Sequence, residues 1–347
     1  MRVSEVGEIG THERIQRALR RDPRELLGYG DDAISMPLEG GGILIAHTDV
    51  LIGSRDVLED MGPFDVGWKA AVMNLSDVIS KGAAPMALLF SWGIPGDYEL
   101  EVVAGIASGM DAAAKECGAF IGGGDTSEAD DLILAGFCFG MAKRGRIIGR
   151  RGARPGDILA STGPFGLTAV AFKVALEGLG APGRIRERAM RAVCRPALRF
   201  KEGMAIAELG SASAGMDCSD GLAKSIHWLS RMSGVGFELS RIPIPEEVME
   251  FAGIHGLDPY ELALYAGGEE YELLYCIKPE LWGDTVSAVE GVGGRLEMLG
   301  RATEGGVILN LDGAIRPVED RGWEHFKGWS QGIGKRNNHL AHSKEGR

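Results

Sequence analysis

The sequence predicts a two-domain protein of mixed α/β (α/β or α+β) architecture. Its length of 347 residues is more than a typical single domain. Residues 43–139 alternate between strand-like apolar runs and helix-like periodicity, in the order strand, helix, strand, helix, strand. A basic segment at 143–156 follows, and a new strand pattern begins at residue 158. We therefore expect one domain at 1–150 and a second at 151–328.

The first half contains six predicted elements. They are a helix at 12–20 behind Thr11 as N-cap, a strand at 43–46, a helix at 65–81, a strand at 86–92, a helix at 100–116 and a strand at 132–139. Thr48 and Asp49 are expected at the end of the first strand. Asp77 lies off the apolar stripe of its helix, so it is either a ligand or a solvated charge.

The second half begins again with a strand. The predicted elements are a strand at 158–163, helices at 166–178 and 186–208, a helix at 222–232, and strands at 273–277 and 307–311. From residue 330 the sequence becomes polar and aperiodic. We expect residues 329–347 to form a disordered tail.

Composition and charge exclude several classes of protein. The hydrophobic fraction of 45% and charged fraction of 25% are ordinary for a soluble globular protein. A net charge of −12 argues against a general nucleic-acid binder. No apolar run is long enough to span a bilayer, and the N-terminus lacks a signal-peptide pattern. Five scattered cysteines favour a reduced, cytoplasmic protein over a disulfide framework.

A glycine-rich segment, Gly122-Gly123-Gly124-Asp125-Thr126-Ser127, separates the helix at 100–116 from the strand at 132–139. Glycines permit positive φ angles and a close approach to a ligand, and successive amide groups can bind an anion. A carboxylate directly after such a turn suits a phosphate that is bound together with Mg²⁺. The structural alternative is an ordinary turn in which Asp125 caps backbone amides.

Other polar segments share this character. Asp31 and Asp32 follow glycines, which suits a cation-binding loop or an Asx-turn. Asp217 and Ser219 precede a helix, where they could cap it or bind an anion or a metal ion. The basic segment at 143–156 is either a solvated linker or the source of an arginine that contacts phosphate.

In chain order these segments resemble the thiamine-monophosphate kinases, within the superfamily that includes aminoimidazole ribonucleotide synthetase. The resemblance spans residues 5–328. The matching segments are Gly30-Asp31-Asp32, Thr48-Asp49, Asn74-Leu75-Ser76-Asp77, Gly123-Gly124-Asp125-Thr126, Arg150 with Gly152-Ala153-Arg154-Pro155-Gly156-Asp157, Asp217-Cys218-Ser219-Asp220-Gly221 and Gly267-Gly268-Glu269.

The resemblance implies a fold, a reaction and a set of ligands. The fold is the two-domain aminoimidazole ribonucleotide synthetase-like fold, whose N-terminal domain binds metal and ATP and forms a homodimer. The reaction is in-line transfer of the ATP γ-phosphoryl group to thiamine monophosphate, assisted by several Mg²⁺ ions, with K⁺ as an additional candidate. The acceptor phosphate is already a dianion near neutrality, so no general base is needed.

The resemblance also implies roles for individual residues. The implied metal ligands are Asp32, Thr48, Asp49, Asp77, Asp125 and Asp217, with Asp220 beside them and His47 as a further candidate. The implied nucleotide contacts are Gly124, Asp125, Arg150 and Ser219. The substrate side comprises Glu269 and Trp323, together with Asp56 and Arg55. Asp125, Asp217 and Arg150 are the implied catalytic residues.

Two departures from the family pattern concern the metal and substrate side. His47 replaces a small hydroxyl residue before the Thr-Asp pair. Asp56 stands where relatives often carry a histidine, and Arg55 beside it could take over an anion contact. Glu270 replaces an aspartate, which is a mild change. Trp323 could stack on a thiamine ring or lie in a core.

Two alternatives therefore remain open. One is a superfamily member that acts on another phosphorylated small metabolite. The other is a non-catalytic protein that binds nucleotide, although binding alone rarely needs so many carboxylates.

Overall fold

The computed structural model describes residues 2–326. The tail expected at 329–347 therefore lies outside the described residues, as do Met1 and residues 327–328.

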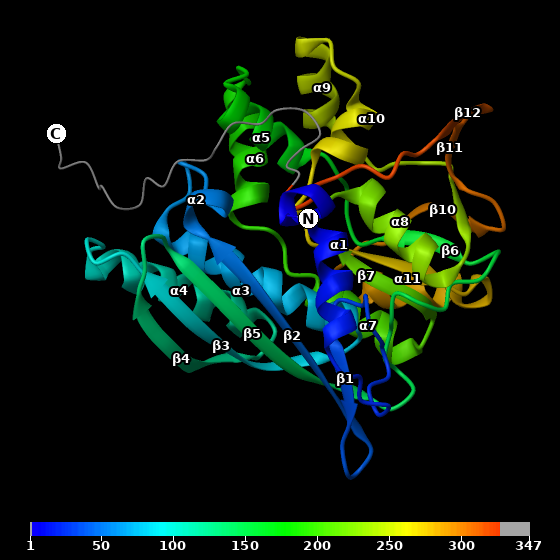
Figure 1. The fold of residues 1–347 in the computed structure, drawn as a ribbon. Coiled ribbons are helices and arrows are strands. Elements are labelled where there is room, and N and C mark those ends of the chain that lie inside the picture. The colour runs from blue at the N-terminus through cyan, green and yellow to red at the C-terminus, as the bar shows by residue number, and fades with distance from the viewer. Residues whose placement is uncertain (1, 327–347) are drawn as a thin grey trace.

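The first half of the chain forms a five-stranded sheet with helices against one face (Figure 1). Its elements are α1 (Val3–Ala18), β1 (Ile34–Pro37), β2 (Gly42–Ile52), α2 (Gly53–Asp56), α3 (Pro63–Ser80), β3 (Ala84–Ile94), α4 (Leu100–Glu116), β4 (Phe120–Glu128) and β5 (Ile133–Lys143). The strand order is β1-β2-β5-β3-β4, with β3 and β4 parallel and the other neighbours antiparallel.

The second half forms a seven-stranded sheet in the order β12-β11-β8-β10-β6-β9-β7. Its elements are β6 (Ile158–Ser161), α5 (Leu167–Glu177), α6 (Gly183–Cys194), α7 (Phe200–Leu209), β7 (Ala212–Cys218), α8 (Leu222–Ser233), β8 (Gly236–Leu239), α9 (Glu246–His255), α10 (Pro259–Glu261), a π-helical turn (Leu262–Ala266), β9 (Glu272–Ile277), a 3₁₀ turn (Pro279–Leu281), α11 (Trp282–Gly291), β10 (Glu297–Thr303), β11 (Val307–Leu311) and β12 (Ala314–Pro317).

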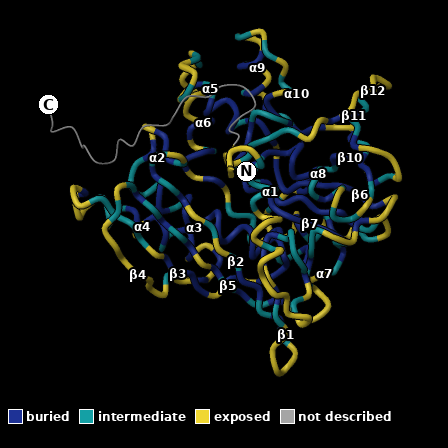
Figure 2. Tube along the Cα trace, viewed as in Figure 1, coloured by how far each residue is buried: buried dark blue, intermediate teal, exposed yellow. Residues whose placement is uncertain are grey.

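Helix α3 is the central element, because it packs against both halves. It is buried from residue 69 to residue 80 and contacts β2 and β5 of the first sheet and β7 and β9 of the second. Its contact with α4 is unusually close at Gly67 and Gly109. A Cβ on Gly67 would lie 1.8 Å from the Ile106 carbonyl oxygen, so this crossing requires glycine. Figure 2 shows the buried residues in the middle of the molecule, whereas the β1–β2 turn is exposed.

Several elements differ from the sequence prediction. Strand β2 continues to Ile52 because all of its residues pair with β5, so Thr48 and Asp49 lie inside the strand and not at its end. The helix predicted at 186–208 is interrupted between α6 and α7, at a segment that contains Pro196. The first helix begins at Val3, ahead of the predicted N-cap Thr11.

The glycine-rich segment is the largest difference. It is part of strand β4, paired in parallel with β3, and is not a loop. A register shift occurs opposite Leu88 and Phe90, where β4 accommodates an extra residue. A Cβ on Gly124 would lie 1.7 Å from the Phe90 carbonyl oxygen, so close strand contact explains this glycine.

Among residues 2–326, no helix has the length and apolar character needed to cross a membrane.

Candidate active site

An acidic cluster lies where α3, β2, β7 and the loop before β1 meet. His47 and Asp49 are two positions apart on β2, so their side chains share the face that packs on α3. Two overlapping groups have ligand atoms within 4.8 Å of one another and could hold a metal ion. They are His47, Asp49 and Asp77, and Asp32, Asp77 and Asp217.

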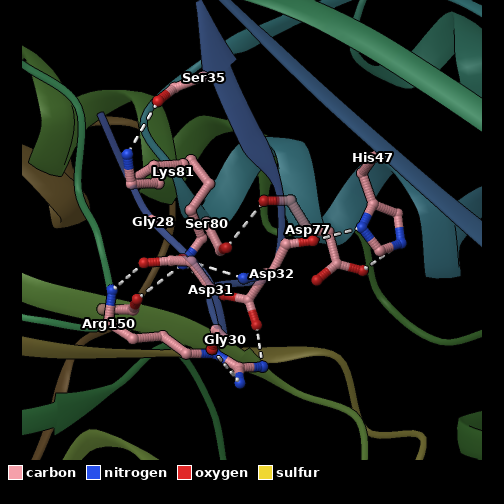
Figure 3. Close-up of polar contacts among 12 residues, drawn as sticks. Gly28, Gly30, Asp31, Asp32, Ser35, His47, Asp77, Ser80, Lys81 and Arg150 are labelled. Carbon is pink, nitrogen blue, oxygen red and sulfur yellow. Dashed lines mark hydrogen bonds and ion pairs between the residues drawn. The ribbon is translucent and has the colours of Figure 1, made fainter. Parts of the chain in front are cut away.

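His47 bridges two of the carboxyl-bearing residues (Figure 3). Its Nδ1 atom makes a short hydrogen bond with the Asp32 carbonyl oxygen, and its Nε2 atom lies 3.1 Å from Asp77 Oδ2. A carbonyl oxygen can only accept, so Nδ1 carries a proton. Burial lowers the pKa of His47, which favours the neutral ring.

Buried Lys81 and partly buried Arg150 hold the loop at Asp31 and Asp32 (Figure 3). Lys81 lies 2.8 Å from Asp31 Oδ1, contacts Asp32 Oδ2 and donates to the Gly215 carbonyl oxygen at 2.9 Å. Arg150 contacts Asp32 Oδ1 through its guanidinium group. The backbone N–H of Arg150 donates to Asp31 Oδ2 at 2.8 Å. These ion pairs lower the pKa of Asp32 against the opposing effect of burial.

For the other carboxyls of the cluster, the effect of burial outweighs that of the neighbouring cations and hydrogen bonds. Burial raises the pKa of Asp49 to about 7 and the pKa of Asp217 to about 7, and neighbouring carboxylates add to both shifts. Burial also raises the pKa of Asp77 well above its usual value, with Asp217 as the next cause. Carboxylates that burial and mutual repulsion destabilise in this way form a favourable environment for cations.

The residue types of the cluster fit Mg²⁺. Carboxylate oxygens are hard donors of the kind that Mg²⁺ prefers. His47 Nε2 is a buried atom without a hydrogen-bond partner among the described residues, and it lies 3.1 Å from Asp77 Oδ2. Buried polar atoms without hydrogen bonds are rare in native proteins and usually indicate an ion or a water.

The end of β7, with Asp217, and the segment after it adjoin this cluster. Asp217 accepts a hydrogen bond from the Ser76 hydroxyl at 2.8 Å. Burial raises the pKa of the Asp220 carboxyl. Neither Asp217 nor Ser219 caps α8, because its N-cap is Gly221 and has no side-chain hydrogen bond. The capping alternative for these two residues is therefore wrong.

The expected substrate residues approach this segment through backbone contacts. The Glu269 N–H donates to the Ser219 carbonyl oxygen at 2.7 Å, and the Trp323 N–H donates to the Asp220 carbonyl oxygen at 3.0 Å. Glu269 has a positive φ of 62°, a costly conformation for a non-glycine residue that often marks a functional site. Trp323 is half-buried, so it is neither a core residue nor fully exposed.

Lys69, a buried lysine that was not predicted as a site residue, connects α3 to two of the expected substrate residues, Glu269 and Asp56. Lys69 Nζ donates to Glu269 Oε1 and to the Asp56 carbonyl oxygen, both at 2.7 Å. The Asp56 carboxylate accepts from the Ile52 N–H at 2.7 Å and so stabilises the turn after β2. Arg55 is exposed. Lys69 within α3 and Lys81 at its C-cap could have been noticed as charges beside long apolar stretches, but their partners are distant in the sequence.

Three expected site residues lie apart from the cluster. Thr48 is exposed on the opposite face of β2 from His47 and Asp49, and its hydroxyl donates to the Gly136 carbonyl oxygen at 2.7 Å. Asp125 is exposed on edge strand β4, opposite exposed Ser91. Gly124 is in the same strand. The structure of one chain therefore does not bring Thr48, Gly124 and Asp125 together with the other predicted ligands.

Comparisons with known proteins agree with this architecture. Residues 30–142 match the family described as AIR synthase related protein, N-terminal domain. The thiamine-monophosphate kinase of Pyrococcus abyssi is 35% identical over 302 residues, which are 86% of this chain and 91% of that protein. The enzyme of Aquifex aeolicus is 30% identical over 328 residues, 94% of this chain and 100% of that protein.

Solved structures agree as well. The structure described as "AaThiL complexed with AMPPCP and TMP" has a TM-score of 0.82 and 30% identity, and the match covers 94% of this chain and 99% of that chain. The fold, the acidic cluster and these similarities lead to one conclusion: this chain is a kinase that belongs to the thiamine-monophosphate kinase family.

Proposed function

We propose that this protein transfers the γ-phosphoryl group of ATP to thiamine monophosphate, giving thiamine diphosphate and ADP. The observation that carries the proposal is the set of buried carboxylates held between the two sheets of a chain in this family. The names of the relatives support the choice of acceptor. The related structure with AMPPCP and TMP supports the pairing of a nucleotide with that acceptor.

The acidic cluster is the place for Mg²⁺ in this proposal. Asp32, His47, Asp49, Asp77 and Asp217 would hold the ions, with Asp220 close to them. Bound there, Mg²⁺ would neutralise phosphate charge and reduce the repulsion between two anionic reactants. A requirement for K⁺ remains a prediction.

Arg150 is the residue we assign to a nucleotide phosphate. Its guanidinium is held by Asp32 and by the Gly30 carbonyl oxygen at 3.0 Å, and it stacks on Trp228 with 5.1 Å between Cζ and the ring centroid. Its buried Nε atom has no hydrogen-bond partner among the described residues. A fork oriented in this way can present its remaining N–H group to a phosphate oxygen, with Ser219 as a further contact.

The substrate residues occupy the adjoining end of the cluster. Lys69 orients Glu269 through their ion pair, and the Asp56 carboxylate is engaged by the turn after β2. We therefore propose that Asp56 shapes this turn, that Arg55 contacts an acceptor anion, and that Trp323 covers the thiamine ring. The acceptor phosphate needs no base at neutral pH because its second pKa is about 6. This proposal gives direct in-line transfer, with these residues orienting the two reactants.

We further propose that two copies pair through the outer face of the first sheet. This face carries exposed apolar side chains at Val50, Leu89 and Phe137, while edge strand β4 exposes Phe120. Exposed apolar patches of this kind commonly mark interfaces. Thr48 and Asp125 lie on the same side of the sheet, so in this proposal they act only in the dimer. In analytical ultracentrifugation the wild-type protein should sediment as a dimer, and Phe137→Glu should sediment as a monomer.

We propose three further points. They are the domain boundaries at 1–150 and 151–328, the cytoplasmic location and the catalytic role of Asp125.

The function is tested by measuring thiamine diphosphate and ADP together, with ATP, Mg²⁺ and thiamine monophosphate as reactants. The wild-type protein should form both products in equal amounts. Asp77→Asn should remain folded and lose activity by orders of magnitude, because Asp77 belongs to both candidate metal groups. Folded protein that binds Mg·ATP but forms no thiamine diphosphate at millimolar acceptor would refute the proposal.

A further inference from the structure

We propose that His47, Asp49 and Asp77 form a site that selects a transition-metal ion such as Mn²⁺ over Mg²⁺. The inference deepens the proposed function, because it rests on the same cluster serving phosphoryl transfer. It concerns the one nitrogen donor in the two candidate metal groups of residues 2–326.

The hydrogen bond at Nδ1 determines the tautomer of His47. The Asp32 carbonyl oxygen fixes the proton on Nδ1, so the neutral ring directs the lone pair of Nε2 toward Asp77. A ring oriented by a backbone carbonyl through one nitrogen is the usual arrangement of a histidine that binds metal through the other. His47 Nε2 is buried and has no hydrogen-bond partner among the described residues.

Two carboxyl groups lie close to His47 Nε2. Asp77 Oδ2 lies 3.1 Å away, and Asp49 supplies a third ligand atom within 4.8 Å of the other two. Two electron-rich atoms at that distance repel unless a proton or a cation is shared between them. A proton shared between His47 Nε2 and Asp77 Oδ2 would not engage the Asp49 ligand atom that lies beside them. A divalent cation satisfies all three, so we favour it.

The type of ion follows from the donors. Imidazole nitrogen raises the affinity of a site for first-row transition-metal ions, of which Mn²⁺ is the weakest binder, whereas Mg²⁺ prefers sites made of oxygen alone. The neighbouring group of Asp32, Asp77 and Asp217 consists only of oxygen donors. Asp77 is common to both groups, so its carboxylate could bridge two ions of different kinds. The structure thus assigns the two groups different metal preferences.

The test uses Mn²⁺ alone with the full, tag-free chain. Electron spin echo envelope modulation of bound Mn²⁺ should show a ¹⁴N coupling from the imidazole, and His47→Ser should lose it. The ratio of the Mg²⁺ to the Mn²⁺ dissociation constant, from competition titration, should fall by about tenfold in His47→Ser. His12→Ser, which removes an exposed histidine of α1, is the matched control and should change neither result.

Each outcome is decisive. Mn²⁺ bound without ¹⁴N coupling, an unchanged ratio, or no Mn²⁺ binding at millimolar concentration would overturn the inference and favour the shared proton. If His47→Ser does not fold, His47→Asn provides the same comparison. Nitrogen coupling in a protein that forms no thiamine diphosphate would refute the proposed function and leave the metal site standing. Thiamine diphosphate formed by a protein whose bound Mn²⁺ shows no nitrogen coupling would support the proposed function and refute the metal site.

Discussion

The raised pKa of Asp217 predicts that the metal-free protein becomes less stable as the pH rises toward neutrality. Asp217 is 1% exposed, and burial raises the pKa of its carboxyl from 3.8 to about 7. The folded state therefore binds this proton more tightly than the unfolded state. The resulting stabilisation is complete below the unfolded pKa and is lost as the pH rises through the folded pKa.

The expected magnitude follows from the same values. Between pH 5 and pH 7 the unfolded carboxyl is ionised while the folded one keeps its proton, so the free energy of unfolding falls by about 1.4 kcal/mol per pH unit. The loss over this interval is about 3 kcal/mol. With an unfolding entropy of about 2 cal/mol/K per residue, a chain of this length should lose about 4 °C in Tm. Asp49 titrates in the same range, so we expect one shared transition.

The assay is a series of thermal unfolding curves from pH 5 to pH 8, recorded with EDTA and with millimolar Mg²⁺. In EDTA the wild-type Tm should fall with pH, and Asp217→Asn should show a smaller slope because it lacks the titrating carboxyl. Mg²⁺ should restore Tm at pH 8 by binding the folded state. Equal slopes in the two proteins, or a wild-type Tm that rises between pH 5 and pH 7, would refute the reasoning.

Three further predictions concern cationic residues. Arg150→Lys keeps the charge but loses the guanidinium fork, so in steady-state kinetics the KM for ATP should rise while the KM for thiamine monophosphate changes less. If both KM values are unchanged, the assignment of Arg150 to a nucleotide phosphate is wrong. Arg55→Ala should raise the KM for thiamine monophosphate well above any change for ATP, and an equal effect on both substrates would argue against an acceptor contact. Lys69→Met leaves Glu269 unpaired and should cost about 3 kcal/mol in chemical denaturation, whereas Lys115→Met, which breaks the exposed pair with Asp111, should cost less than about 1 kcal/mol. Similar losses in the two lysine variants would show that the buried pair has no special role.

The sequence alone was sufficient for the fold class and for about half of the elements, whereas β1, β4, β7, β8, α9, α11, β10 and β12 were not predicted. The periodicity at 65–81 predicted α3 within two residues, and the helix at 100–116 has the predicted bounds. Both features depend on neighbours along the chain, which the sequence displays directly. The family could also be identified from the sequence, because its acidic and glycine-rich segments follow one another in a characteristic order along the chain.

The composition of the site was decided by tertiary structure. Lys69 and Glu269 are 200 positions apart, so no local pattern pairs them. The separation of Asp125 from Asp49 depends on how β4 aligns with β3 and on side-chain alternation along each strand, and a shift of one residue would reverse the face. The hydrogen bond that fixes the His47 tautomer comes from a backbone carbonyl, which every residue carries. Sequence can name the residues that carry the chemistry, but only the packing of α3 between the two sheets determines which of them meet.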